Sequence, residues 1–236
     1  MQELKKIIKQ TSLMGIIFDF DGIILETEIP RFNAWRSLFQ EYGLPFTIEQ
    51  WHLGVGTGPS VFNPAEILAD QTKGKIEAYQ AQVIADERAQ AFVFQEPILP
   101  GVQELIQTAK SSGIKLAVAS SSEEDWVLGN LERIGLLSLM DAVCTADDVT
   151  NVKPDPELYL LALDKLGLSP GACLAFEDSP NGVLAARRAG LRCVAVPTRM
   201  TSRMDLSAAN LIINSICDLD LASFPDLQAK SLLQGC

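Results

Sequence analysis

Histidine is nearly absent from this chain of 236 residues, which contains one, His52. A Ser-His-Asp triad needs a histidine as its base, and most zinc sites use several histidine or cysteine ligands. The five cysteines are scattered and form no CxxC pair. Because Cys144, Cys173 and Cys193 lie in apolar runs, we expect buried free thiols in a reducing compartment. These shortages argue against a histidine triad and a zinc centre.

Basic residues are also few, with 19 Lys and Arg against 30 Asp and Glu, for a formal net charge of -11. Such a surface is not attracted to a phosphate backbone or to acidic lipids, which argues against nucleic-acid and membrane partners. No run approaches the roughly 18 apolar residues of a membrane span. The first 14 residues lack the apolar core of a signal peptide. We therefore expect a soluble cytoplasmic protein. If such an acidic protein handles phosphates, it needs local cations, and a bound divalent metal ion is one solution.

Short apolar runs alternate with helical patterns over most of the chain. This alternation is typical of an α/β fold, a doubly wound parallel sheet with right-handed crossovers. The apolar runs predict strands at 16–18, 116–119, 142–144, 173–176 and 193–197, with a sixth at 211–213. Helices are expected between them, one of which has Asp155 as its N-cap and Pro156 in its first turn. A closing helix is expected over 218–233.

Residues 28 to about 94 differ from the rest, because their apolar side chains recur at helical spacing and strand signals are weak. A glycine-rich turn at 54–59 interrupts them, and the Pro- and Gly-containing stretch 96–101 follows. We expect a small helical domain at 28–96, inserted into an α/β domain made of 1–27 and 97–236. Phe32, Trp35 and Phe39 are expected in the core of the insertion.

Polar residues follow several of the predicted strands where each strand ends. Asp19 and Asp21 follow the first, Ser120 the second, and Glu177 with Asp178 the fourth; Lys153 lies beyond the third. The carboxyl ends of parallel strands are where α/β sheets bind ligands. Carboxylates and a hydroxyl with one lysine can hold Mg²⁺ and a phosphate together. Taken alone, the Asp19–Gly22 stretch also fits a solvated strand end before a glycine turn.

Four segments in this order carry a family resemblance: FDFDG, VASSS, VKPDPELY and FEDSPNGVLAARRAG. They resemble the four motifs of the haloacid dehalogenase (HAD) superfamily. The helical insertion resembles the C1-type cap of its β-phosphoglucomutase-like phosphatase branch. The resemblance implies the strand order 5-4-1-2-3, in which the strands before Asp19 and Asp178 are neighbours.

The resemblance also implies a role for each motif residue. Asp19 would be the nucleophile, and Asp21 the general acid that later acts as base. Asp178 would bind Mg²⁺ together with Asp19 and the backbone carbonyl of Asp21. Glu177 would assist directly or through water, although a supporting role at the helix N-terminus is an open alternative.

Two further motif residues would contact the phosphate. Ser120 would donate to a phosphoryl oxygen, and Lys153 would neutralise charge on the phosphate and the nucleophile. A helix cap and an ordinary surface lysine are their structural alternatives.

Two departures weaken a mutase interpretation. β-Phosphoglucomutases carry a histidine four residues after the threonine that matches Thr27, and Arg31 stands there; the loop from Gly54 to Gly58 also lacks their arginines. The candidates for substrate contact are Thr27, Arg31, Gly54 and Ser121. We therefore predict a monomeric Mg²⁺-dependent phosphatase of a small phosphorylated metabolite, such as a sugar phosphate. A β-phosphoglucomutase-type mutase and a HAD-fold binding or regulatory protein are the alternatives.

Overall fold

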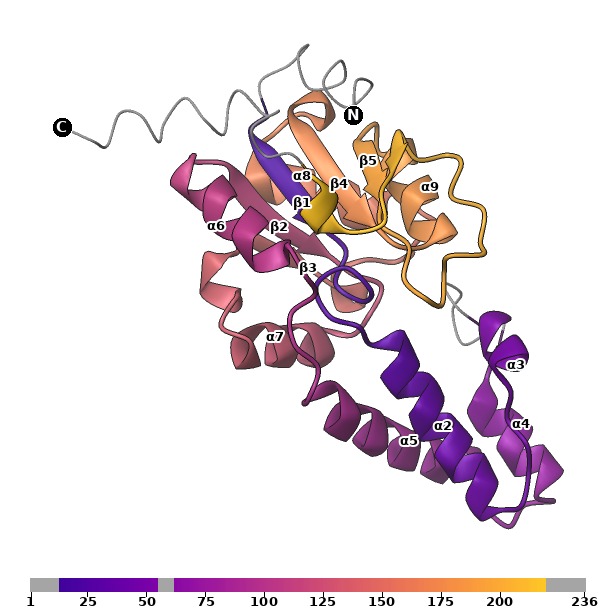
Figure 1. Ribbon diagram of the computed structural model, residues 1–236. Coiled ribbons are helices and arrows are strands. Elements are labelled where there is room, and N and C mark those ends of the chain that lie inside the picture. Colours follow the sequence, from indigo (N-terminus) through magenta and orange to yellow (C-terminus); the bar gives the residue numbers. More distant parts are fainter. Residues whose placement is uncertain (1–12, 55–61, 220–236) are drawn as a thin grey trace. The chain divides into compact units, whose positions relative to one another are not determined.

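The computed structural model describes residues 13–54 and 62–219 (Figure 1). The chain divides into two compact units, one formed by residues 25–97 and the other by the segments on either side of it. Within the described ranges, no helix is long and apolar enough to cross a membrane.

The larger unit is built on a sheet of six strands, all paired in parallel. The strands are β1 (Gly15–Phe18), β2 (Lys115–Ala119), β3 (Ala142–Cys144), β4 (Cys173–Glu177), β5 (Arg192–Ala195) and β6 (Leu211–Ile212). Their order is β3-β2-β1-β4-β5-β6, which contains the expected order of five strands and adds β6 beside β5. The continuous apolar runs of the sequence are explained because β1 and β4 are buried along their whole length.

Four helices connect these strands (Figure 1): α6 (Val102–Ser111), α7 (Glu124–Arg133), α8 (Glu157–Leu166) and α9 (Pro180–Arg188). On one face of the sheet, α8 and α9 pack over Ile17, Ala117 and Ala175 in a single hydrophobic core. On the other face, the rings of Phe18 and Phe176 stack with centroids 5.5 Å apart. The central strands are thus covered on both faces, as the α/β prediction requires.

The predicted start of α8 was wrong by one residue. Its N-cap is Pro156 instead of Asp155, and the helix begins at Glu157. Asp155 still serves the helix start, because its Oδ1 accepts the N–H of Glu157 at 3.0 Å. The Asp155 side chain therefore accepts a hydrogen bond from the first N–H group of the helix, although Asp155 lies one residue before the N-cap.

The smaller unit contains α2 (Glu28–Glu41), α3 (Ile48–His52), α4 (Pro64–Gln71) and α5 (Ala78–Val93). Its core holds Phe32, Trp35 and Phe39, which are buried as expected. The rings of Phe39 and Phe46 stack at 4.5 Å. Glu26 lies just before α2, and its Oε1 accepts the N–H groups of Glu28 and Ile29 at 3.1 and 3.2 Å. This carboxylate thus stabilises the helix start, where a negative charge is favoured.

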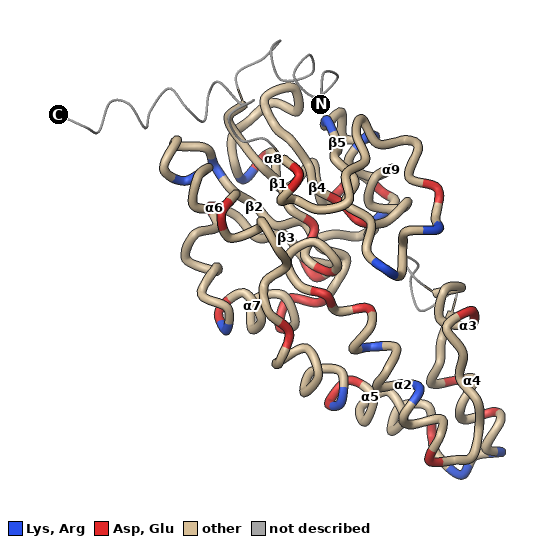
Figure 2. Tube along the Cα trace, viewed as in Figure 1, with Lys and Arg blue, Asp and Glu red and all other residues tan. Residues whose placement is uncertain are grey.

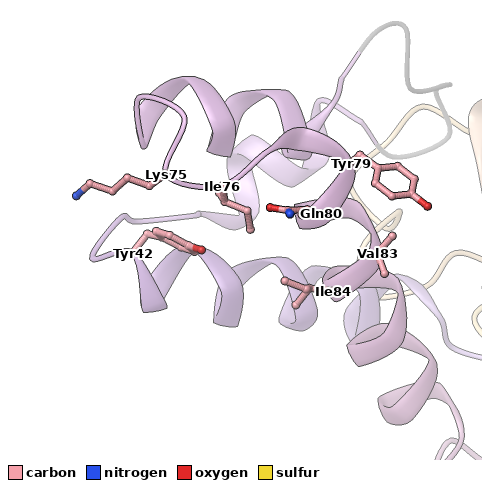
Figure 3. A pocket seen from close by; sticks show the side chains of 7 residues that line it. All are labelled: Tyr42, Lys75, Ile76, Tyr79, Gln80, Val83 and Ile84. Atoms are coloured by element: carbon pink, nitrogen blue, oxygen red, sulfur yellow. The ribbon is translucent and has the colours of Figure 1, made fainter.

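A surface hollow of about 360 Å³ lies on the smaller unit beside the start of α5 (Figure 3). It is lined by Tyr42, Lys75, Ile76, Tyr79, Gln80, Val83 and Ile84. None of the residues singled out in the sequence lines this hollow.

Near the end of the described residues, Ile216–Asp218 forms a short 3-10 helix, η4. The described residues end at 219, so nearly all of the helix expected over 218–233 lies outside them. Glycines 56 and 58 also lie outside the described residues. Cys144, Cys173 and Cys193 are buried free thiols, as predicted.

Candidate active site

Three carboxylates from two separate segments meet at the carboxyl ends of the two central strands. Asp19 follows β1, Glu177 ends β4, and Asp178 follows it. β1 and β4 are neighbours, and Phe18 pairs with Phe176, so Asp19 and Glu177 reach the same level of the sheet. One oxygen of each carboxylate lies within 4.8 Å of the others, and all three residues are buried. The strand order therefore brings together residues more than 150 positions apart.

Lys153 supplies a cation to this carboxylate cluster. Its Nζ lies 2.8 Å from Asp19 Oδ1 and 2.7 Å from Glu177 Oε1. Burial alone would lower the pKa of Lys153, but the attraction of the two carboxylates raises it above its ordinary value. The adjoining loop is held in place because Arg188 donates to the carbonyl of Pro154 at 2.7 Å. Lys153 is therefore a fixed, charged group.

The cluster carries excess negative charge. Burial, and then repulsion by Glu177, raises the pKa of Asp19 to about 8, while Lys153 acts in the opposite direction. Three carboxylates and one ammonium sum to a formal charge of -2, which a divalent cation would neutralise. Their oxygens are the hard ligands that divalent cations such as Mg²⁺ prefer. Asp19, Asp178 and Glu177 therefore fit a divalent metal ion by chemistry, burial and mutual distance.

Glu177 is shared among several donors, which bears on the role that the sequence left open. Its Oε1 accepts hydrogen bonds from Lys153 at 2.7 Å and from the hydroxyl of Tyr159 at 2.6 Å. Its Oε2 accepts one from Ser179 at 3.5 Å. Tyr159 was not singled out in the sequence, although it ends the VKPDPELY segment, six residues after Lys153. Glu177 thus orients Lys153, whether or not it also contacts a metal ion.

The carboxylate of Glu177 lies directly against the backbone of α9 at Gly182, where a Cβ atom would overlap it. We expect Gly182→Ala to lower the free energy of unfolding by about 1–3 kcal/mol, because the overlap displaces a buried carboxylate. Gly129→Ala is the matched control, since nothing lies near a Cβ built there in α7. Alanine is a better helix former than glycine, so this control should be about 0.5–1 kcal/mol more stable than wild type. Urea denaturation checks both, and equal stability of the two variants would contradict the packing argument.

Asp178 has neighbours that sequence reasoning missed. Thr201, in the segment after β5, is buried, and its Oγ1 donates to Asp178 Oδ2 at 3.4 Å. Gly22 has a φ of 77°, and a Cβ there would overlap the Asp178 carboxylate. The glycine after Asp21 is therefore required both by backbone conformation and by this close approach.

Asp21 and Ser120 lie next to each other. Asp21 Oδ2 accepts hydrogen bonds from Ser122 Oγ at 2.6 Å and from Ser120 Oγ at 3.4 Å. Asp21 Oδ1 accepts one from Trp126 Nε1 at 3.1 Å. Ser120 is buried, whereas Ser121 is exposed. The sequence reasoning missed Ser122 and Trp126, because a serine run and a lone tryptophan carry no specific signal.

The other candidates for substrate contact belong to the smaller unit. Thr27 is buried and precedes α2 without a side-chain capping bond. Arg31 is partly exposed in the first turn of α2. Gly54 follows α3 and packs closely against the ring of Phe62. Their contact with a substrate stays a prediction.

The buried carboxylates lie at the carboxyl ends of β1 and β4, where the strand order reverses, and this topological switch point is where enzymes of the open α/β class bind their ligands. The family model of haloacid dehalogenase-like hydrolases matches residues 16–196, and the chain belongs to this family. The resemblance seen in the sequence is thereby confirmed.

Individual relatives agree with this assignment. The chain is 40% identical over 214 residues to YhcW of Bacillus subtilis, whose name classes it provisionally as a phosphatase; the match covers 91% of this chain and 97% of that protein. It is 36% identical over 179 residues to the phosphorylated carbohydrates phosphatase of Thermotoga maritima, covering 75% and 82%. The crystal structure of CbbY from Rhodobacter sphaeroides in complex with phosphate is similar, with a TM-score of 0.76 and 29% identity over 90% of this chain and 99% of that one.

Proposed function

We propose that this protein is a Mg²⁺-dependent phosphatase that hydrolyses a small phosphorylated metabolite, such as a sugar phosphate, through an aspartyl-phosphate on Asp19. The observation that carries the proposal is the pairing of Asp19 Oδ1 with Lys153 Nζ at 2.8 Å inside a buried carboxylate cluster. Relatives that are named as phosphatases, one of them for phosphorylated carbohydrates, support this reaction class.

In the first half-reaction, Asp19 attacks phosphorus. Asp19 Oδ1 accepts hydrogen bonds from the N–H of Phe20 at 2.7 Å and from Lys153, which leaves Oδ2 as the attacking oxygen. A bond forms between Oδ2 and phosphorus, and the bond from phosphorus to the leaving oxygen breaks. Asp21 gives a proton to that oxygen, so the product leaves as a neutral alcohol. Lys153 and Ser120 stabilise the charge on the phosphoryl oxygens.

In the second half-reaction, water attacks phosphorus and loses a proton to Asp21. The bond between Asp19 and phosphorus breaks, which returns a free carboxylate and releases inorganic phosphate. Mg²⁺ held by Asp19, Asp178 and Glu177 would offset the negative charge that the carboxylates and phosphate share. The unit formed by residues 25–97 is proposed to act as a cap that excludes bulk water and selects the substrate.

The test is release of inorganic phosphate from a panel of phosphorylated metabolites, with Mg²⁺ and with a chelator. We expect release from at least one sugar phosphate, with loss of activity in the chelator and recovery on adding Mg²⁺. The panel includes β-glucose 1-phosphate with a bisphosphate primer, because isomerisation without phosphate release would show a mutase instead. Binding of phosphorylated compounds without any turnover would favour a binding or regulatory protein.

A further inference from the structure

The carboxylate of Asp21 is held by side chains that no motif assignment explains. Ser122 donates to Oδ2 at 2.6 Å, and the indole N–H of Trp126 donates to Oδ1 at 3.1 Å. The donors lie 101 and 105 positions from Asp21 in the chain, Ser122 on the segment that joins β2 to α7 and Trp126 in α7 itself. Because each carboxylate oxygen has its own donor, the rotation of the group is restricted in both torsions.

The donors themselves are anchored. The N–H of Ala146 donates to the carbonyl of Ser122 at 3.0 Å, which ties the serine to the short 3-10 helix η2 (Ala146–Asp148) after β3. Trp126 lies in the first turn of α7, and Asn130 Nδ2 donates to its carbonyl at 2.9 Å. Asn130 is itself buried. Ser122 and Trp126 therefore hold Asp21 from a rigid support.

Helix capping does not account for this arrangement. The N-cap of α7 is Glu123, which makes no side-chain capping bond, and Ser122 and Trp126 both donate to Asp21 through their side chains. The arrangement instead fits the geometric need of a general acid. Such a group must lie within hydrogen-bond reach of the leaving oxygen, and a displacement of about 1 Å can cost on the order of 100-fold in rate.

We propose that Ser122 and Trp126 are positioning residues that fix the carboxylate of Asp21 for proton transfer to the leaving oxygen and from the attacking water. This inference rests on the proposed phosphatase function and adds two residues to it. They act through Asp21, so their removal affects the chemical step and leaves substrate affinity unchanged.

The experiment compares two substrates that differ in their need for an acid. An alkyl phosphate identified by the metabolite panel needs its leaving oxygen protonated, whereas 4-nitrophenyl phosphate releases a stable phenolate. For the alkyl ester we expect Trp126→Phe or Ser122→Ala to lower kcat about 10-fold, and the double variant about 100-fold, with KM unchanged. For 4-nitrophenyl phosphate the loss should be less than about 3-fold. Ser122→Thr keeps the hydroxyl and should restore most of the rate.

Two controls separate positioning from general damage. In an Asp21→Ala background, adding Trp126→Phe should change the residual rate less than about 2-fold, because residues that act through one group are not additive. Ser138→Ala, at an exposed serine between α7 and β3, should leave the activity unchanged.

Several results would overturn the inference. One is a fall in kcat that is equal for the two substrates. Another is a Trp126→Phe effect on the rate that is as large in the Asp21→Ala background as in wild type. A third is a rise in KM with kcat unchanged, which would make Ser122 a substrate ligand. If wild type hydrolyses both esters and the variants match it, the positioning role alone fails. If wild type hydrolyses neither ester nor any other phosphate, the proposed function fails with it.

Discussion

Asp19→Asn is expected to abolish phosphate release while making the metal-free protein more stable. The amide of asparagine cannot form the proposed aspartyl-phosphate, so the rate should fall about 10⁴-fold or more. The gain in stability has a separate cause. Burial and the neighbouring Glu177 raise the pKa of Asp19 to about 8, which means that the folded protein disfavours its ionised form.

The pH dependence follows from the direction of that shift. An Asp whose pKa is higher in the folded state than in the unfolded state binds more protons when folded, so the folded state loses stability as pH rises. The cost begins near pH 4, where the unfolded side chain ionises, and grows until about pH 8. The advantage of Asp19→Asn over wild type should therefore be larger at pH 8 than at pH 5.

Urea denaturation in the presence of a chelator measures this difference at the two pH values. Asp164→Asn is the matched control, because Asp164 lies exposed on α8. It should leave both the activity and the pH dependence of stability unchanged. Hydrolysis by Asp19→Asn at the wild-type rate would show that Asp19 is not the nucleophile. If the stability advantage of Asp19→Asn over wild type became smaller as pH rises, the argument from burial would be contradicted.

Lys153→Met is expected to have the largest effect on stability. The ammonium is buried between Asp19 and Glu177, at 2.8 and 2.7 Å. Methionine is similar in length, but it leaves two buried carboxylates without this cation. Removing one partner of a buried ion pair typically costs about 3–5 kcal/mol. We also expect phosphate release to be lost, since Lys153 is proposed to neutralise the phosphoryl oxygens.

Lys110→Met gives the comparison for this prediction. Lys110 pairs with Asp141 at 3.1 Å, but both side chains are about a third exposed. Exposed pairs of this kind contribute less than about 1 kcal/mol, so this variant should unfold close to wild type. The urea concentrations at half-unfolding of Lys153→Met, Lys110→Met and wild type, measured under the same conditions, test this difference in stability. If Lys153→Met is no less stable than Lys110→Met, the buried pairs do not stabilise the fold as argued.

Much of the fold could be predicted because the signals for it are local. Five of the six described strands are mostly buried and mostly apolar. Their alternation with helices leaves few topologies other than a parallel doubly wound sheet. The acidic character of the candidate active site could also be predicted, since Asp19 and Asp178 directly follow such strands. The prediction of Asp155 as the N-cap of α8 was wrong by one residue, because Pro156 is the N-cap and not the first residue inside the helix. The position of a helix start within one residue is a local detail of the backbone.

Other features depended on contacts between distant segments. Tyr159 meets Glu177, Thr201 meets Asp178, and Trp126 meets Asp21, each across crossovers of the sheet. An isolated tyrosine, threonine or tryptophan in a sequence gives no sign of its partner. Glu26 differs from these residues because its partners, the N–H groups of Glu28 and Ile29, are close to it in the sequence. Its hydrogen bonds still depend on the backbone conformation at the start of α2.

Taken by itself, the order of residues determined the family, the α/β sheet and the acidic strand ends, because hydrophobic periodicity and motif spacing are written along the chain. Only the tertiary structure decided that Glu177 lies between Lys153 and Tyr159, and that Asp21 is held by Ser122 and Trp126. The physical reason is that a hydrogen bond depends on ångström distances between side chains, and those distances exist only after the strands have paired and the helices have packed onto them.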